Sequence, residues 1–253
     1  MGIQIDSQLR HLVDRAWLQF NSFKRSTDHV VGSCPILYFG NRRKYLNSDC
    51  RIITVGLNPS RLEFENSNPH VLFKGQASDY SGYLKALDGY FERDPYEKWF
   101  NMGYEHLLNG LGGGYYGDQP NTVLHTDLCS TIATTPTWSS LAKKYPKLCD
   151  ALQSEGVKLW RLLTRYLNPD LIIISIQKAL VEKEIAPEGE WKTIYTLPRR
   201  RPYEIKTCLW EGRRVVFGLA ANTPFGKISY EAKEKIGRFL KHYYRLGLSA
   251  RGQ

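Results

Sequence analysis

The stretch Arg51-Ile-Ile-Thr-Val-Gly-Leu-Asn-Pro-Ser60 decides the fold. It opens with four consecutive β-branched residues, which are typical of a buried parallel strand. Gly56 lets the backbone approach another group closely, and Pro59 ends the strand because it fixes φ and lacks an N–H. Leu57 and Asn58 are therefore expected at the carboxyl end of a buried strand, where open α/β sheets bind their ligands.

Further apolar runs alternate with helical patterns along the chain. An amphipathic pattern over residues 155–167 predicts a helix, and the Ile-rich run that follows Asn168-Pro169 predicts a strand. This alternation indicates an α/β fold with a parallel sheet. The other expected strands are residues 121–130 and 214–221, with shorter β-like runs at 193–196 and 203–209 and a hairpin turn at Glu211-Gly212.

Length and composition favour one large domain. The chain has 253 residues and 42% hydrophobic content, which is enough for a packed core. We expect a single domain over residues 1–253, made of an N-terminal helix and basic loop (1–45) and an α/β core (46–245). The helix is expected over residues 4–24, and the basic loop is Asn41-Arg-Arg-Lys44.

The charge balance points to a polyanionic partner. Lys and Arg number 35 against 25 Asp and Glu, which gives a formal charge of +10. Nucleic acid is the natural partner for such a chain, and a basic but indifferent surface is the alternative. Sixteen Tyr and six Trp suit wet interfaces and base stacking, although most aromatic side chains belong in the core.

The cysteines and the hydropathy pattern indicate a cytoplasmic protein. The five cysteines include no Cys-x-x-Cys pair, and no secretory signal precedes them, so we expect reduced intracellular thiols. No apolar run approaches the length of a membrane span, so no membrane association is expected.

The spelling Gly56-Leu-Asn-Pro-Ser60 resembles the first active-site motif of the uracil-DNA glycosylase superfamily. The mismatch-specific and single-strand-selective branches carry Gly-x-Asn-Pro-Gly there. The resemblance implies that Asn58 positions the attacking water, that Gly56 and Leu57 line the base pocket, and that Ser60, which replaces the last Gly, faces the DNA. An aromatic residue downstream stacks on the flipped base in this superfamily. Phe64 and Phe73 are the candidates, with Phe73 preferred and a core role open for both.

Two later segments resemble other superfamily motifs. Thr126-Asp-Leu-Cys-Ser130 matches the base-reading motif, with Asp127 where the family has Asn. Asp127 has two alternative interpretations, as the cap of a turn or as the partner of a nearby Arg. Asn222-Thr-Pro-Phe-Gly-Lys-Ile-Ser229 resembles the second active-site motif with one residue inserted. There the resemblance implies that Asn222 donates to the base O2.

The remaining DNA contacts are expected around the last motif and in a cationic loop. Lys227, Ile228 or Phe225 would fill the gap that a flipped base leaves in the duplex. Ser229 caps the following helix, whose free N–H groups can hold a phosphate. The segment Pro198-Arg-Arg-Arg-Pro202 is a stiff cationic loop, so Arg199, Arg200 and Arg201 are expected to bind phosphates.

The resemblance implies a three-layer α/β/α sandwich around a four-stranded, mainly parallel sheet. It also implies a monomeric, monofunctional DNA glycosylase that needs no metal or organic cofactor. The close N-terminal Cys pair of the iron–sulfur branches is missing here. Because a carboxylate accepts hydrogen bonds but cannot donate them, Asp127 favours the amino edge of cytosine over uracil. We therefore expect a modified cytosine, 5-hydroxymethylated or glucosylated, in phage DNA as the substrate, since some superfamily members act in phage defence.

Three alternatives remain open. The protein could be a uracil or mismatch glycosylase of base excision repair. It could be a non-catalytic DNA-binding relic of the fold, which need not keep both Asn58 and Asn222. It could also be an unrelated nucleotide-binding α/β protein, but such proteins carry a Gly-rich turn where this chain has Pro59.

Overall fold

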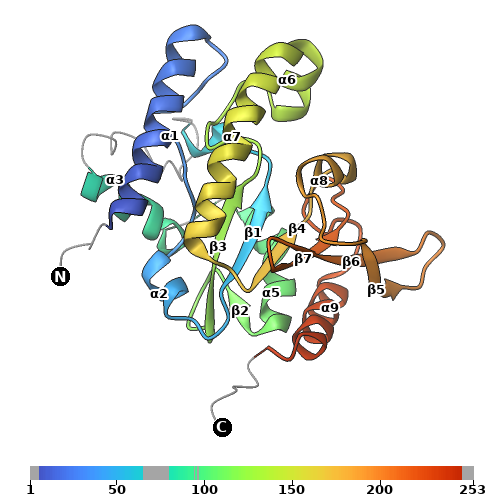
Figure 1. Ribbon diagram of the computed structural model, residues 1–253. Coiled ribbons are helices and arrows are strands. Elements are labelled where there is room, and N and C mark those ends of the chain that lie inside the picture. The colour runs from blue at the N-terminus through green and yellow to red at the C-terminus, as the bar shows by residue number, and fades with distance from the viewer. Residues whose placement is uncertain (1–5, 65–79, 94, 96, 247–253) are drawn as a thin grey trace. The chain divides into compact units, whose positions relative to one another are not determined.

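A sheet of seven strands, in the order β2-β3-β1-β4-β7-β6-β5, runs through the computed structural model (Figure 1). The pairs β2–β3, β1–β4 and β4–β7 are parallel, whereas β5–β6 and β6–β7 are antiparallel. The strands are Ile52–Gly56 (β1), Gly113–Gly114 (β2), Asn121–Asp127 (β3), Leu171–Ile174 (β4), Lys192–Leu197 (β5), Tyr203–Trp210 (β6) and Arg213–Gly218 (β7).

The mostly parallel sheet confirms the α/β class, but the sheet is larger than the four strands expected. The two short runs near residues 193 and 203 form a hairpin that adds to β7, as Ile205 pairs with Gly218 and Trp210 with Arg213. β2 was not expected, because two glycines carry no side-chain pattern. The three-layer arrangement and the likeness to the glycosylase fold stay predictions.

The structure describes residues 6–64, 80–93, 95 and 97–246. They form two compact units that interleave along the sequence, so they do not follow the expected boundary at residue 45. Unit 1 takes Met1–Gly40, Gly56–Pro95 and His125–Asn168, and unit 2 takes Asn41–Val55, Tyr96–Leu124 and Pro169–Gln253. β1 and β3 therefore begin in unit 2 and end in unit 1.

The strands of unit 2 pair as their β-branched composition predicts. Ile52 lies opposite Leu171 and Val55 lies opposite Ile174, and all residues of β1 and β4 are buried. Continuous apolar strands of this kind suit a sheet that is covered on both faces. Their carboxyl ends, where the polar residues of the motifs begin, are thereby fixed by the core.

Unit 1 is built on two long helices that lie side by side, α1 and α7 (Figure 1). Leu9 and Leu12 of α1 and Leu159 and Leu163 of α7 are buried, as amphipathic helices require. The helix predicted at 155–167 is confirmed and begins earlier, at Pro146. The helices of this unit are α1 (Ser7–Ser26), η1 (Arg61–Glu63), α3 (Tyr80–Asp88), η2 (Tyr90–Glu92), α6 (Trp138–Lys144) and α7 (Pro146–Leu167).

In unit 2, α5 and α9 cross at two glycines. A Cβ at Gly110 would lie 2.2 Å from the carbonyl oxygen of Glu234, and a Cβ at Gly237 would lie 2.1 Å from that of Leu107. Only glycine permits so close a backbone approach. The helices are α2 (Arg42–Leu46), α4 (Glu97–Trp99), the π-helix η3 (Phe100–Glu105), α5 (His106–Leu111), α8 (Lys178–Glu184) and α9 (Tyr230–Tyr243).

Two local predictions have different outcomes. Ser229 caps α9, since its Oγ accepts from the N–H of Ala232 (3.1 Å), as expected. The basic loop expected at residues 41–44 is instead the start of α2, because the Asn41 side chain accepts from the N–H of Lys44 and caps a helix there. None of the helices in the described part of the chain is both long and apolar enough to cross a membrane.

Candidate functional site

Asn58 of unit 1 is held by its amide nitrogen. Nδ2 donates to the main-chain carbonyl of Ile132 (3.1 Å) and to Oγ1 of Thr134 (3.3 Å). Because a carbonyl only accepts, the nitrogen end of the amide must face Ile132, and this fixes the orientation of the side chain. Among the described residues, none donates to the amide oxygen. A half-buried acceptor held in this way suits the orientation of a water molecule.

The segment that anchors Asn58 is itself held by main-chain hydrogen bonds. Residues 131–133 pair with residues 31–36 through N–H···O distances of 2.7 and 3.0 Å. The hydroxyl of Thr134 donates to the carbonyl of Pro136 (3.2 Å), so it meets Asn58 as an acceptor. Every hydrogen bond around the Asn58 nitrogen therefore has a defined direction, and the amide has little freedom to rotate.

The backbone of the motif is tied to the residues that follow β3. The carbonyl of Gly56 accepts from the N–H of Leu128 (3.0 Å), and the carbonyl of Leu57 accepts from the N–H of Cys129 (2.8 Å). These bonds extend strand-like pairing beyond β1, although the sequence places the two segments about 70 residues apart. The motif at Asn58 is thereby brought next to the segment that follows Asp127.

Asp127 is packed directly against Gly56. A Cβ at Gly56 would lie 2.4 Å from Asp127 Oδ1 and 2.9 Å from His125 Nε2, so a larger residue there must displace one of these side chains. His125 Nε2 lies 3.7 Å from Asp127 Oδ1, which is longer than a hydrogen bond but close enough for an ion pair when the imidazole is protonated. Asp127 thus has a histidine as its neighbour, in place of the arginine partner considered from the sequence.

Burial raises the pKa of the carboxyl in this cluster. Asp127 is only 5% exposed, and this desolvation raises the pKa of its carboxyl, while His125 acts in the opposite direction. The sequence signal for His125 is its place two residues before Asp127 on a strand, which puts both side chains on one face.

Glu63 adds a second buried carboxyl that the sequence argument missed. Its Oε1 accepts from the hydroxyl of Tyr90 (2.8 Å). Burial raises the pKa of Glu63 to about 8, the Asp127 carboxylate adds to the rise, and the Tyr90 hydrogen bond opposes it. Burial therefore favours the protonated form of Glu63. Ser60 and Glu63 have the spacing of a capping box, a pattern that would leave Glu63 at the surface, whereas the structure turns it inward.

Ser60 and the aromatic candidates have distinct local roles. The Oγ of Ser60 accepts from the N–H of Leu62 (3.2 Å) and caps η1, and its expected DNA contact stays a prediction. Phe64 is half-buried against Gly32, where a Cβ would lie 2.8 Å from the Phe64 ring. Phe73, the preferred base-stacking residue, lies outside the described residues.

The other predicted asparagine, Asn222, belongs to unit 2 and is exposed. Its backbone is left-handed, with φ of 64°, and its neighbours Ala221 and Thr223 form an isolated bridge. Among the described residues no side-chain hydrogen bond holds Asn222. The amide is therefore available to a ligand, and its expected contact with the base O2 stays a prediction.

Phe225 does not have the role predicted for it. Its ring is fully buried, and a Cβ at Gly218 would lie 2.4 Å from it. Its N–H donates to Oγ of Ser175 (2.7 Å). The idea that Phe225 fills the gap in the duplex is therefore wrong, because the ring belongs to the core of unit 2. Lys227 is exposed and Ile228 half-buried, so these two stay candidates for that role.

No family model, curated protein or solved structure matches this chain.

Two residues of unit 2 that hold its backbone, Tyr104 and Lys233, were not predicted from the sequence. The hydroxyl of Tyr104 donates to the carbonyl of Val55 (2.8 Å) and accepts from the N–H of Ser175 (3.1 Å), so it joins the ends of β1 and β4. The Nζ of Lys233 donates to three carbonyls, those of Met102 (2.5 Å), Gly103 (3.0 Å) and Pro224 (3.2 Å). In sequence these residues look like ordinary members of amphipathic helices, so no pattern marked them.

The candidate site contains acids and amides. In the described part of the chain, no group of three or more His, Cys, Asp or Glu side chains is placed to hold an ion. All five cysteines are buried as free thiols.

Proposed function

We propose that this protein is a monofunctional DNA glycosylase that hydrolyses the N-glycosidic bond of a flipped-out pyrimidine and leaves an abasic site. One observation carries the proposal. The amide nitrogen of Asn58 is fixed by Ile132 and Thr134, which leaves the amide oxygen as an oriented acceptor. The backbone of the same motif is bonded to the residues that directly follow the buried Asp127. An oriented water and a polar group that reads the base are the two requirements of this reaction.

The reaction needs charge stabilisation at both ends of the broken bond. Cleavage passes through an oxocarbenium-like sugar and an anionic leaving base. Asn58 holds the water against the sugar, but its amide is too weak a base to take up a proton. The water adds to the oxocarbenium-like carbon as the bond to the base breaks, and the proton that it loses passes to the departing anionic base. Asn222, whose amide is exposed, donates to O2 of the base and stabilises the charge that develops there.

Asp127 favours a cytosine derivative as the base. A carboxylate accepts from the exocyclic amino group of cytosine, whereas it would meet O4 of uracil as one acceptor facing another. Burial raises the pKa of the Asp127 carboxyl, and if the carboxyl carried a proton it would also donate to N3 of cytosine. Because excision of ordinary cytosine would destroy the host genome, we propose a 5-hydroxymethylated or glucosylated cytosine, as found in phage DNA. A role on such DNA requires a cytoplasmic protein.

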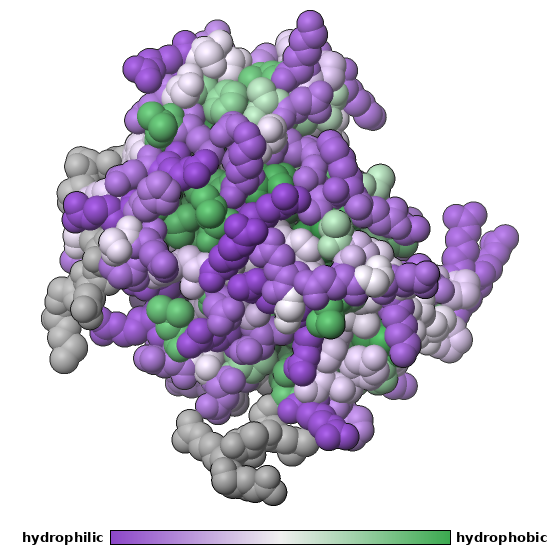
Figure 2. Space-filling view, viewed as in Figure 1, coloured by the Kyte–Doolittle hydropathy of each residue, from purple (hydrophilic) through white to green (hydrophobic). Residues whose placement is uncertain are grey.

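The formal charge of +10 supports a DNA substrate. Exposed cationic side chains gather in the loop between β5 and β6, and hydrophilic side chains project from the end of this hairpin in Figure 2. We propose that this loop contacts the phosphate backbone and that the protein works as a monomer.

The test compares four DNAs, which contain uracil, cytosine, 5-hydroxymethylcytosine or glucosylated 5-hydroxymethylcytosine. Each is incubated with wild type or Asp127→Asn, and abasic sites are detected by alkaline cleavage. Wild type should release a modified cytosine, and Asp127→Asn should shift activity toward uracil. Asn58→Ala is the inactive control.

Two outcomes would contradict the proposal. Release of uracil by wild type, with no activity on any cytosine derivative, would make the protein a uracil or mismatch repair glycosylase. Retained DNA binding with no release of any of the four bases would favour the non-catalytic DNA-binding module.

A further inference from the structure

The three arginines at the tip of the β5–β6 hairpin are chemically alike but do not have the same surroundings. All three are exposed, and together they line a hollow of about 350 Å³. The guanidinium of Arg199 donates from Nε to the carbonyl of Arg201 (2.8 Å) and from one terminal nitrogen to the carbonyl of Lys227 (2.6 Å). No described residue forms a hydrogen bond or an ion pair with the side chains of Arg200 and Arg201.

Arg199 also stacks on an aromatic ring that reaches the same loop. Its guanidinium carbon lies 5.3 Å from the centroid of the Tyr203 ring, and the Tyr203 hydroxyl donates to the carbonyl of Leu219 (2.6 Å). Leu219 is where the chain leaves β7, and Lys227 lies near the start of α9. The segment from Leu219 to Lys227 is thus held at both ends, by Tyr203 at Leu219 and by Arg199 at Lys227.

This segment has a backbone that needs external support. Asn222, Phe225 and Lys227 have positive φ values of 64°, 49° and 66°, a region that residues with side chains adopt only with strain. Such conformations persist where surrounding contacts over-determine them. Ser175 and the core hold Phe225 from inside, and Arg199 holds the carbonyl of Lys227 from outside.

We propose that Arg199 is a positioning residue that fixes the loop carrying Asn222, whereas Arg200 and Arg201 supply the phosphate contacts of the hairpin. The inference deepens the proposed function, because it rests on Asn222 and DNA as parts of the site. The three arginines, which look equivalent in the sequence, thereby have two different roles. Lysine cannot replace Arg199, because an ammonium lacks the planar fork that donates to two carbonyls while its face stacks on a ring.

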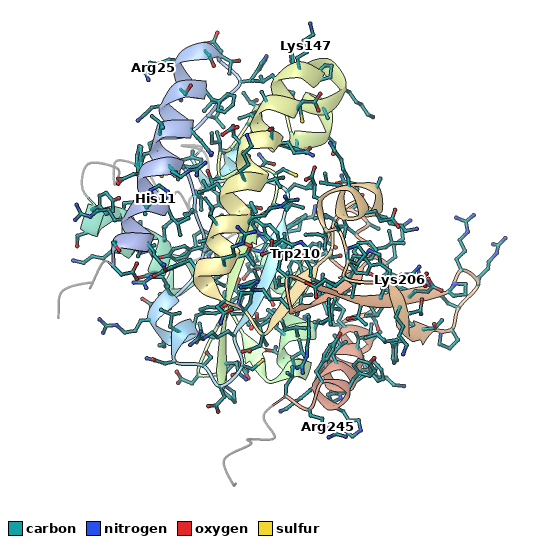
Figure 3. The ribbon with its side chains drawn as sticks, in the orientation of Figure 1. His11, Arg25, Lys147, Lys206, Trp210 and Arg245 are labelled. Atoms are coloured by element: carbon teal, nitrogen blue, oxygen red, sulfur yellow. The ribbon has the colours of Figure 1, made fainter. Side chains whose placement is uncertain are left out.

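The experiment compares Arg199→Lys, which keeps the charge, with the double variant Arg200→Ala/Arg201→Ala. Lys206→Ala is the control. Lys206 lies on β6 away from the tip, is labelled in Figure 3, and pairs with Glu204 (3.4 Å). The first readout needs no DNA. Hydrogen exchange is measured at the amides of Ala221 and Gly226, which bond to the carbonyl of Thr223.

Arg199→Lys should accelerate exchange at these two amides about tenfold, since loss of the outer support opens the loop locally. In the double variant and in the Lys206 control, the exchange rates of these two amides should stay within about twofold of wild type. Neither change removes a contact with residues 219–227. Exchange in Arg199→Lys equal to that of wild type would overturn the proposal, whatever the protein does to DNA.

The second readout is DNA binding as a function of salt. The double variant should lower the slope of log Kd against log salt by about one for each lost phosphate contact, while Arg199→Lys should keep the wild-type slope. In base release, Arg199→Lys should lower kcat with KM unchanged, whereas the double variant should raise KM. If both variants lowered the slope of log Kd against log salt equally, Arg199 would be a phosphate contact, and its role as a positioning residue would be contradicted.

Failure of the proposed function would look different. If no base is released from any DNA, the kcat comparison disappears, but the exchange experiment on the free protein still decides whether Arg199 holds the loop.

Discussion

The two asparagines that carry the candidate chemistry sit in opposite surroundings. Asn58 follows a buried strand, and its amide nitrogen is held by two acceptors at 3.1 and 3.3 Å. Asn222 also follows a strand, but it is exposed and has a left-handed backbone with φ of 64°. The side chain of Asn58 is fixed by its hydrogen-bond partners, whereas Asn222 is held through the backbone of residues 219–227.

This difference changes what a mutation reports. Removal of the Asn58 side chain takes a donor from a buried carbonyl, so activity and stability should fall together. Removal of the Asn222 side chain takes no bond from any described residue, so any loss of activity there would belong to the chemistry. The predictions below sharpen this contrast, from the largest expected effect to the smallest.

Asn58→Ala should lower base release by about ten- to a thousandfold while DNA binding survives, because the water loses its acceptor. It should also lower the free energy of unfolding by about 1–3 kcal/mol, because the Ile132 carbonyl loses its donor. Single-turnover kinetics and urea unfolding measure the two effects. Thr134→Val is the matched control and should cost less activity, since the bond to Ile132 remains. Unchanged base release in Asn58→Ala would remove this residue from the mechanism.

Gly56→Ala should destabilise the protein by about 1–3 kcal/mol, as overpacked sites do. The new methyl group would lie 2.4 Å from Asp127 Oδ1, so it must displace Asp127 or His125. Gly212→Ala lies in a turn with no atom within 4 Å and serves as a comparison for an uncrowded position, although its φ of 72° carries strain of its own. Urea unfolding checks both variants. If Gly56→Ala is as stable as wild type, the close packing of Asp127 is contradicted.

Glu63→Gln should flatten the pH dependence of stability. The pKa of Glu63 is raised to about 8, so the folded state keeps a proton that the unfolded state releases above its ordinary pKa of 4.5. Stability from this group is complete below about pH 4.5 and is lost as the pH rises through 8.

Gln does not titrate, so the free energy of unfolding should fall less steeply with pH by up to about 1.4 kcal/mol per pH unit. Urea unfolding between pH 5 and 9 measures the slopes. The raised pKa of Glu105, about 7, is present in both proteins and cancels in the difference. Parallel curves would show that Glu63 is charged in the folded protein at neutral pH.

Asn222→Gly should have the smallest effect on stability, within about 0.5 kcal/mol, because glycine adopts positive φ without strain and no described residue loses a bond. Asn222→Ala should be less stable than the glycine variant by about 1 kcal/mol, since alanine resists the left-handed region. Thermal unfolding measures both. Equal stability of the two variants would argue against the left-handed backbone, and full base release by Asn222→Gly would remove its side chain from the mechanism.

Much of the fold could be predicted from local patterns. The β-branched run before Gly56, the Ile-rich run at β4 and the Ser229 cap all lie where the sequence predicted them. These features depend on neighbours within a few residues, so a linear pattern contains them. The basic residues at 41–44 were mistaken for a loop because the Asn41 cap is as common in turns as at helix starts.

Much of the side-chain arrangement at the candidate site could not be predicted from local sequence patterns. The sequence by itself determined that Asn58 follows a buried strand, because Pro59 stops that strand, and that Asp127 lies on a second strand. Only the tertiary structure decided that Glu63 turns inward to Tyr90, that Phe225 is core, and that Arg199 faces a backbone carbonyl. The reason is physical: burial, pKa and hydrogen-bond partners depend on groups that are distant in the chain and meet only when it folds.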